Sequence, residues 1–224
     1  MNEILVAQNL KKTYMDGFSK LYVLKGINLS VTKKDLLAIT GISGSGKSTL
    51  LHLLGALDVP TDGKVYLDGT DVHTMGEREL SDVRNRRLGF IFQLYYLLPE
   101  FSIFENVLLP AMARGKDKET AERAHSLLER VGLKERMNHY PVELSGGEMQ
   151  RAAIARALVN SPEIVFADEP TGNLDSKNSR SILDLIIKLN DEEHQVFIIA
   201  THEVSIGSVA RRTFCLNNGI LEPQ

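Results

Sequence analysis

Short apolar runs, bounded by glycine-rich or polar segments, recur along this chain and predict buried β-strands. They span residues 36–40, 88–92, 163–167 and 196–200. Segments with helical patterning accompany them at residues 77–87 and 177–193, and a short helix is expected after His202. Strands that alternate with helices in this way predict an α/β core.

The two ends of the chain add strands of a different character. Residues 4–10 predict a strand, and a polar loop is expected to follow and to run on to Lys20. Apolar and polar residues alternate over residues 27–31, which is typical of a half-buried strand. Residues 64–68 predict a further strand, and the Asn218-Gly219 turn predicts a hairpin at the end of the chain.

The pattern changes between residues 94 and 160, where strand-like runs disappear. Helices are expected over residues 103–114 and 116–131 and from Gly147 onward. We interpret this stretch as a helical subdomain inserted into the α/β core. The core and its β-subdomain then comprise residues 1–93 and 161–224.

The composition is that of an ordinary globular protein, with 43% hydrophobic and 25% charged residues among 224. The net charge of −3 gives no reason to expect a nucleic-acid partner. The single cysteine, Cys215, excludes an intrachain disulfide, suits a reducing compartment and is expected to be a packed core thiol. No secretory signal pattern is found, and no apolar run approaches the ~20 residues that cross a bilayer. Any membrane-spanning part is therefore expected on another chain.

A glycine-rich loop, GISGSGKS at residues 41–48, lies between the apolar run at residues 36–40 and an apolar helix. This is the G-x-x-x-x-G-K-[ST] pattern in the strand–loop–helix context that it requires. Backbone N–H groups of such a loop cradle phosphates, and the positive end of the helix dipole adds to the field. The sequence therefore predicts a phosphate site in which Lys47 reaches the outer phosphates and the Ser48 hydroxyl ligates Mg²⁺.

Two carboxylates, Asp168 and Glu169, end the apolar strand at residues 163–167. Ligands of α/β sheets bind at the carboxyl ends of parallel strands. We therefore expect Asp168 to hold Mg²⁺ or its water beside the phosphates. Glu169 points in a different direction and is the expected general base for the attacking water.

The segment LSGGE at residues 144–148 leads directly into a helix. Two glycines and a serine in that place suit an anion site at a helix N-terminus. A serine N-cap followed by flexible glycines explains the same pattern. The residues alone leave both interpretations open.

Taken together, these motifs resemble the nucleotide-binding subunits of ABC transporters over nearly the whole chain. The fold that the resemblance implies is α/β: a P-loop NTPase (RecA-like) core, an N-terminal antiparallel β-subdomain and an inserted α-helical subdomain. It implies ATP hydrolysis with Mg²⁺ and adds the Q-loop Gln93, the D-loop Asp175, the switch His202 and the adenine-stacking Tyr14. The implied catalytic residues are Glu169, His202 and Lys47, and the implied metal ligands are Ser48, Gln93 and Asp168. The implied ATP-binding residues are Tyr14, Gly41, Ile42, Ser43, Gly44, Ser45, Gly46, Lys47, Ser48, Thr49, Gln93, Ser145, Gly146, Gly147, Glu148 and Asp175.

Several longer stretches, among them ARALVNSPEIVFADEPTGNLDS, look like the lipoprotein-releasing branch of that family, the LolD type. The MacB type of macrolide or peptide exporter and the FtsE type of division complex are similar too. Glu148 stands where many cassettes have glutamine, and Lys34-Asp35 replaces the usual Gly-Glu. Neither departure touches the expected chemistry.

The resemblance also implies partners. The segment LSGGE of one subunit would cover the nucleotide held by a second copy, so that two chains enclose two ATP molecules. Membrane subunits of the LolC/LolE kind would dock near residues 94–104, which places the chain at the cytoplasmic face of the bacterial inner membrane. The same apolar residues would also suit the core of the helical subdomain.

Other P-loop proteins fit less well. A GTPase should carry N-K-x-D, which is absent, and a small-molecule kinase needs neither LSGGE nor the Asp168-Glu169 pair. A DNA-repair ATPase of the same superfamily would place a long coiled coil within residues 94–143, where no sustained heptads occur. A division or signalling module that uses the same ATPase remains an alternative to transport.

Overall fold

The computed structural model describes residues 3–17, 19–113, 118–207 and 209–224. Residues 114, 116 and 117 of the two expected helices in the middle of the chain lie outside this part. No helix among the described residues has the length and apolar character that crossing a bilayer requires.

The strands are β1 (Glu3–Asp16), β2 (Ser19–Thr32), β3 (Leu36–Thr40), β4 (Asp62–Leu67), β5 (Thr70–Asp71), β6 (Leu88–Phe92), β7 (Ile164–Asp168), β8 (Val196–Thr201), β9 (Arg212–Asn217) and β10 (Ile220–Pro223). The α-helices are α1 (Lys47–Leu54), α2 (Glu77–Arg87), α3 (Ile103–Met112), α4 (Lys118–Arg130), α5 (Gly146–Leu158), α6 (Ser176–Glu193) and α7 (Val204–Gly207). Short 3₁₀ turns occur at Val72–Thr74, Lys134–Arg136 and Pro141–Glu143.

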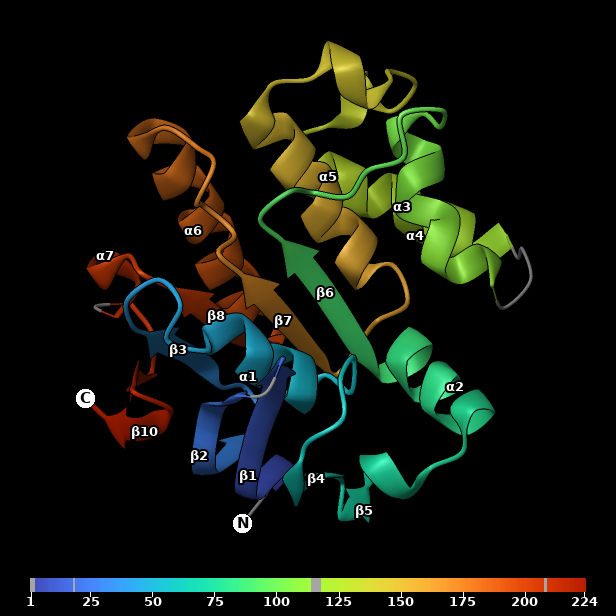
Figure 1. Ribbon diagram of the computed structural model, residues 1–224. Coiled ribbons are helices and arrows are strands. Elements are labelled where there is room, and N and C mark those ends of the chain that lie inside the picture. The colour runs from blue at the N-terminus through green and yellow to red at the C-terminus, as the bar shows by residue number, and fades with distance from the viewer. Residues whose placement is uncertain (1–2, 18, 114–117, 208) are drawn as a thin grey trace.

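Two sheets form the strand-rich part of the molecule (Figure 1). A four-stranded antiparallel sheet has the order β2-β1-β4-β5, and a six-stranded sheet has the order β10-β9-β3-β8-β7-β6. Within the second sheet β9, β3, β8, β7 and β6 run parallel, and only β10 is antiparallel to its neighbour. This is the expected α/β core with an antiparallel β-subdomain.

The parallel sheet has a hydrophobic core on each face, because successive side chains of a strand point to opposite sides. In β3, Leu37 and Ile39 join the cluster that surrounds α1 and the antiparallel sheet. Leu36 and Ala38 join the other cluster, which contains α6 and the helices of the middle segment. Helix α1 is therefore enclosed between two sheets, which fixes the loop that precedes it.

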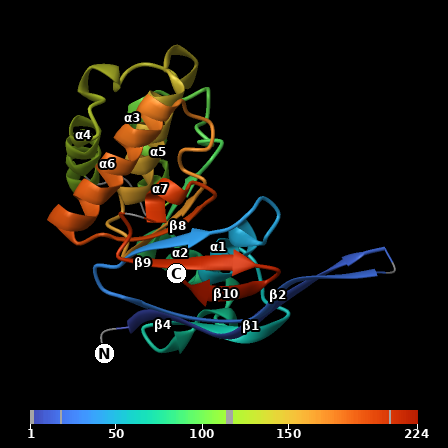
Figure 2. The ribbon, with the colours of Figure 1, turned by 90° about the vertical axis from the view of Figure 1, so that its left-hand side faces the viewer.

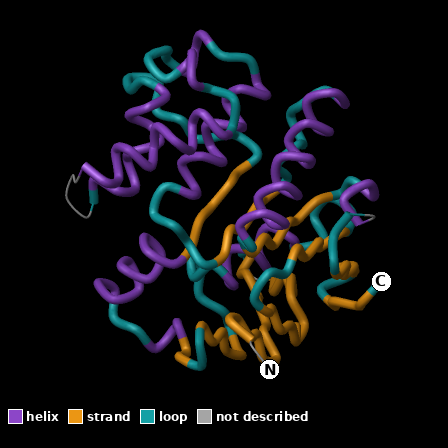
Figure 3. The backbone as a smooth tube through the Cα atoms, turned by 180° about the vertical axis from the view of Figure 1, so that it is seen from behind, coloured by secondary structure: helices purple, strands orange, loops and turns teal. Residues whose placement is uncertain are grey.

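Between β6 and β7, the described residues contain helices and turns but no strand. Helices α3, α4 and α5 pack together around buried residues such as Val107, Leu128 and Ala152. From behind, these helices lie at one end of the molecule and most strands at the other (Figure 3).

The prediction of a polar loop before Lys20 is wrong. Strand β1 continues to Asp16 and β2 begins at Ser19, so that Tyr14 pairs with Leu21. The resulting hairpin projects well beyond the rest of the sheet (Figure 2). Its polar composition suits a ribbon that is solvated on one side, because an antiparallel pair needs only one apolar face.

The expected burial of Cys215 is only partly met. Its side chain is half-buried on β9, near the edge of the parallel sheet, where β10 alone lies outside it.

Candidate functional site

The carboxyl ends of four parallel strands meet at one edge of the sheet. Thr40 of β3 pairs with Thr201 of β8, and Asp168 of β7 pairs with Ala200 on one side and Phe92 of β6 on the other. The residues that follow these strand ends are Gly41, His202, Glu169 and Gln93. The in-register ends thus bring four segments that are distant in sequence to one place.

The phosphate loop (residues 41–48) turns sharply between β3 and α1. Gly46 is the N-cap of α1 with φ 102°, a conformation that disfavours residues with a Cβ. At Gly41 a Cβ would lie 2.5 Å from the carbonyl oxygen of Leu216 on β9. Glycine is required at both positions for different reasons, backbone conformation at Gly46 and close approach at Gly41.

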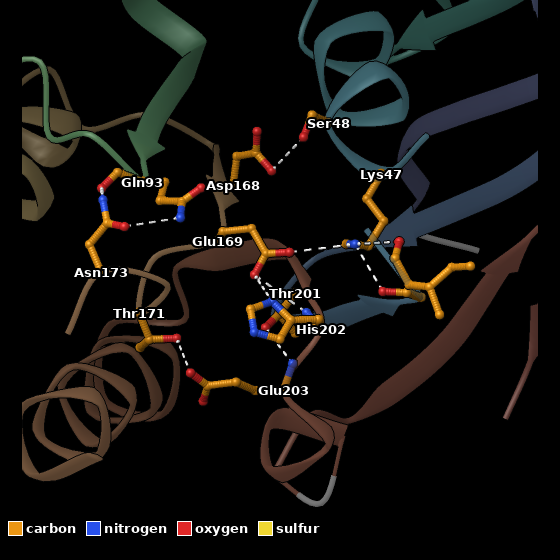
Figure 4. A network of polar contacts seen from close by, with 12 residues as sticks. Lys47, Ser48, Gln93, Asp168, Glu169, Thr171, Asn173, Thr201, His202 and Glu203 are labelled. Carbon is orange, nitrogen blue, oxygen red and sulfur yellow. Dashed lines mark hydrogen bonds and ion pairs between the residues drawn. The ribbon is translucent and has the colours of Figure 1, made fainter. Parts of the chain in front are cut away.

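Lys47 is 6% exposed and its ammonium group points back into the loop. Its Nζ donates to the carbonyl oxygens of Gly41 at 2.9 Å and of Ile42 at 3.1 Å. Nζ also lies 3.4 Å from Oε1 of Glu169 (Figure 4). The cation is therefore satisfied entirely by groups that surround the loop.

Glu169 connects the phosphate loop to the end of β8. Its backbone has φ 46°, an uncommon value for a residue other than glycine, and its N–H donates to the carbonyl of Ala200 at 2.9 Å. Its Oε2 lies 2.7 Å from Nδ1 of His202 (Figure 4). The left-handed backbone turns the carboxylate toward Lys47 and His202, away from the direction of Asp168. Glu169 thus contacts both of the other residues expected to be catalytic, Lys47 and His202.

Ser48 and Asp168 form a second polar pair beside the loop. The Ser48 hydroxyl donates to Oδ1 of Asp168 at 3.0 Å (Figure 4). Burial raises the pKa of Asp168 by more than the hydrogen bond from Ser48 lowers it. These are two hard oxygen donors, and a Mg²⁺ ion that also binds nucleotide phosphates takes only one or two such ligands from protein. The pair therefore fits a magnesium site.

Gln93 is anchored by the segment that follows Glu169. Its Nε2 donates to Oδ1 of Asn173 at 3.1 Å, and Nδ2 of Asn173 donates to the Gln93 carbonyl at 3.0 Å. In the part of the chain that the structure describes, no hydrogen bond joins Gln93 to Ser48 or Asp168.

A cavity of about 690 Å³ lies over the phosphate loop. Its walls are Tyr14, Leu21, Val23, Ile42, Ser43, Gly44, Gly46, Lys47, Ser48, Thr49, Gln93, Glu169 and His202. Eleven of these are among the expected site residues. Leu21 and Val23 were not predicted to belong to the site, because the sequence pattern placed them in or beside a loop. Their spacing, two apolar residues separated by one position, was the available sign that this segment is a strand with one apolar face.

Tyr14, on the projecting hairpin, is one of the residues that line this cavity. It pairs across the hairpin with Leu21, and both side chains line the cavity. A tyrosine ring beside two aliphatic side chains provides a flat apolar wall, which is suited to the face of a nucleobase.

The signature segment (residues 144–148) is absent from the walls of that cavity. Ser145 caps α5 by accepting from the N–H of Glu148, and a Glu148 carboxylate oxygen accepts from the N–H of Ser145 at 2.9 Å. These bonds from Ser145 lower the pKa of Glu148. The segment begins α5 at the end of the helical region remote from α1 (Figure 1). Ser145, Gly146, Gly147 and Glu148 are thus not brought to the phosphate loop of their own chain.

Asp175 is also outside the cavity. It is the N-cap of α6, where its carboxylate accepts from the N–H of Asn178 at 2.9 Å and from the Asn178 side chain at 2.6 Å. These bonds lower its pKa. Within one chain the residue therefore has a capping role.

The apolar segment at residues 94–104 divides into two sets. Leu94, Tyr96 and Leu98 are exposed, whereas Ile103 is fully buried and Leu97 packs against the core. A second cavity, of about 540 Å³, borders Tyr96 between α2, β6 and the ends of α3 and α5. Exposed residues of this segment are thus available for the expected docking surface, and other residues of the same segment pack in the expected core of the subdomain.

Arg156 of α5 hydrogen-bonds to the backbone of this segment. Its guanidinium donates to the carbonyl oxygen of Tyr95 at 2.6 Å and to that of Tyr96. Both tyrosines have positive φ, 61° and 48°. No sequence pattern indicated this role of Arg156, since its partners are backbone carbonyls distant in the chain.

Comparison with known proteins places this architecture in a family. The family model described as ABC transporter matches residues 24–172. The lipoprotein-releasing system ATP-binding protein LolD of Aquifex aeolicus (strain VF5) is 49% identical over 98% of this chain and 96% of its own. The protein of the same name from Legionella pneumophila (strain Paris) is 48% identical over 99% and 98%.

Solved structures agree. The dimeric structure of MJ0796, described as a bacterial ABC transporter cassette, has a TM-score of 0.89 at 39% identity, and covers 97% of this chain and 96% of its own. A dimeric post-hydrolysis structure of MJ0796 bound to ADP and Pi has the same TM-score at 38% identity, with the same coverage. With its strand-end cluster, its phosphate loop and its full-length relatives, this chain belongs to the ABC transporter family, as one of the family's ATPase subunits.

Proposed function

We propose that this chain is the ATP-hydrolysing subunit of a transporter that releases lipoproteins from the bacterial inner membrane toward the outer membrane. The observation that carries the proposal is the near-complete, 46–49% identity to proteins named as ATP-binding proteins of the lipoprotein-releasing system. A MacB-type exporter or an FtsE-type division complex is the alternative, because all three share the cassette.

The cavity over the phosphate loop is the proposed ATP site. Lys47 and the N–H groups of residues 41–48 would bind the phosphates, and Ser48 and Asp168 would hold Mg²⁺ with Gln93 as a further ligand. The base would lie against Tyr14. The bond to Asn173 uses only the amide nitrogen of Gln93 and leaves its amide oxygen available to the metal.

Glu169 is the proposed general base, and His202 its neighbour at the outer phosphate. In the structure Lys47 neutralises Glu169 at 3.4 Å. Phosphates compete for the same ammonium group, so nucleotide binding would draw Lys47 away and leave Glu169 available to a water. His202 would keep the carboxylate oriented through its 2.7 Å contact.

Two copies would be needed for a complete site. The signature segment caps α5 and does not line the cavity of its own chain. Its N-terminal glycines would instead cover the nucleotide of a second copy, with Asp175 near the same interface. We propose a head-to-tail homodimer that encloses two ATP molecules.

Mixed dimers test this arrangement. Lys47→Ala and Gly146→Asp chains, each carrying a different affinity tag, are expected to be inactive alone. In a head-to-tail mixed dimer one composite site carries both lesions and the other carries neither, so part of the ATPase activity should return. A side chain at Gly146 would crowd the Tyr95 hydroxyl, which lies 3.0 Å from an ideal Cβ, so the melting temperature of that variant is checked first. Verified mixed dimers with no activity would count against a composite site in which one intact half suffices.

We further propose that residues 94–160 form the coupling subdomain, and that residues 1–93 and 161–224 form the nucleotide-binding core. Integral membrane subunits of the LolC/LolE kind would dock at the exposed residues of the 94–104 segment. The chain would then be peripheral to the cytoplasmic face of the inner membrane. Reconstitution with the native membrane subunits, followed by identification of the released cargo, separates lipoprotein release from the alternatives.

A further inference from the structure

A nearly buried lysine, Lys12, lies next to Tyr14, the residue proposed to bind the base. Its side chain is 11% exposed. Nζ donates to Oδ1 of Asp58 and to the carbonyl of Val59, each at 2.7 Å. It also lies 4.8 Å from the centre of the Tyr14 ring, within the range of a cation–π contact. A buried ammonium group persists only when such partners are supplied.

Asp58 joins this cation to the tyrosine. Its second carboxylate oxygen accepts from the Tyr14 hydroxyl at 2.9 Å. Burial alone would raise the pKa of Asp58, but the hydrogen bonds from Lys12, Tyr14 and the Val59 backbone together lower it. The carboxylate is thus charged and shared between the ammonium group and the phenol.

The same carboxylate ties the tyrosine to the phosphate-binding helix. Asp58 lies four residues after the end of α1, and its N–H donates to the carbonyl of His52 within that helix. Near the other end of α1, Thr49 lines the same cavity as Tyr14. Tyr14 belongs to the projecting hairpin, yet its hydroxyl donates to a carboxylate that is tied by its own backbone to the helix that begins at Lys47.

We propose that Lys12 and Asp58 are positioning residues for nucleotide binding: they fix the Tyr14 ring at a set place relative to the phosphate loop, so that base and phosphates are bound together. This rests on the proposed function, in which Tyr14 receives the base. The hairpin that carries Tyr14 is a two-stranded ribbon, which has little stability of its own. Without the bonds to Lys12 and Asp58, the Tyr14 ring would become ordered only when the base binds. The entropy cost of that ordering would weaken the affinity for ATP.

The chain contains its own matched control, one residue away. Lys11 pairs with Asp62 at 2.8 Å between the same two segments, but both side chains are well exposed, at 42% and 60%. Within the part of the chain that the structure describes, neither Lys11 nor Asp62 forms a hydrogen bond to Tyr14. Removing this pair deletes one positive charge from β1 and one negative charge from the start of β4, and leaves the bonds of Lys12 and Asp58 to the Tyr14 ring intact.

Calorimetry with two ligands tests the proposal, each with Mg²⁺ present: ATP, and inorganic tripolyphosphate, which has the phosphates but no base. Stacking on an aromatic side chain is worth about 5- to 150-fold in affinity. Lys12→Met, Asp58→Ala and the milder Asp58→Asn are expected to weaken ATP binding by about 3- to 10-fold, as a part of that stacking contribution. Tripolyphosphate affinity should stay within about twofold, and Lys11→Met and Asp62→Ala should change neither ligand, as exposed pairs contribute little.

A double variant decides whether Asp58 acts through the tyrosine. In a Tyr14→Ala background, Asp58→Asn should cost no further ATP affinity, because the group that it positions is gone. An equal further loss in that background, or a parallel loss of tripolyphosphate binding, would overturn the positioning role. So would unchanged ATP affinity in Asp58→Asn and Asp58→Ala together.

The outcomes also separate this inference from the proposed function. If Tyr14→Ala leaves ATP affinity unchanged, the base platform itself is wrong and the positioning role falls with it. If Lys47→Ala leaves tripolyphosphate affinity unchanged, the phosphate site is wrong. Loss of affinity in Tyr14→Ala and Lys47→Ala with no effect of the Asp58 variants would leave the proposed function standing and remove the inference alone.

Discussion

The carboxylate of Glu169 lies 3.4 Å from the ammonium group of Lys47, and neither side chain is more than 15% exposed. The phosphate-loop lysine and the proposed base therefore neutralise each other in the nucleotide-free protein. Two opposite charges at that burial would be costly apart. The pair accounts for how both groups are kept in place while no phosphate is bound.

Replacing Glu169 separates binding from chemistry. Glu169→Gln is expected to keep ATP affinity and to lose hydrolysis by roughly 10²–10⁴-fold, the usual contribution of a general base. An ATP-bound dimer should accumulate on gel filtration. Glu192→Gln, an exposed carboxylate on α6, is the control. Near-normal turnover of the Glu169 variant would remove it from the role of base.

Asp168 should show a conflict between stability and function. Its folded-state pKa is raised by burial, so its charge costs stability at neutral pH, and that cost disappears as the pH falls through the folded pKa. Asp168→Asn is therefore expected to raise the melting temperature of the nucleotide-free protein at pH 7. The difference from wild type should shrink in acid, and Mg²⁺-dependent turnover should be lost. A lower melting temperature at pH 7 would contradict the burial argument.

The segment after Gln93 allows docking and packing to be tested separately. Leu94 is 63% exposed, so Leu94→Gln should leave the melting temperature unchanged and weaken pull-down of the membrane subunits. Leu97 packs against the core, so Leu97→Gln should lower the melting temperature as well. Ile220→Gln, also an exposed apolar residue but on β10, is the control. Normal pull-down and transport by Leu94→Gln would place the docking surface elsewhere.

Asn106 is a polar side chain buried completely in α3. Its Oδ1 accepts from the N–H of Leu98 at 2.7 Å, and its Nδ2 donates to the carbonyls of Leu98, Phe101 and Ser102. Asn106→Ala leaves these partly buried backbone groups without their partner and is expected to cost about 1–3 kcal/mol in the free energy of unfolding. Urea denaturation against Asn138→Ala, an exposed asparagine, measures the difference.

Much of the architecture was predictable because it depends on local patterns. The runs ending at Thr40, Phe92 and Asp168 are buried on both faces, so each reads as a strand without reference to its neighbours. The phosphate loop was predictable because its glycines permit the backbone conformations that the loop requires. Parallel pairing then follows from the connecting helices, and the strand ends with their chemistry fall on one edge.

What sequence could not supply is the non-local pairing of polar residues. The hairpin at Tyr14 forms because β1 and β2 pair across a tip of few residues, a choice that neither strand's composition reveals. Lys12, Asp58, Asn106 and Arg156 look like ordinary surface or helix residues in the sequence. Each acquires its role from a carboxylate, ring or carbonyl that the fold brings from elsewhere.

Helix α5 is capped at one end by Ser145, and eleven residues later its Arg156 binds the carbonyls of Tyr95 and Tyr96. At 1.5 Å per residue it is a rod about 20 Å long, stiff compared with the loop it touches. A tilt of this rod shifts the signature segment and the loop after Gln93 in the same movement. One helix thus connects the proposed dimer interface to the proposed docking segment, and a displacement of either one would be transmitted to the other through it.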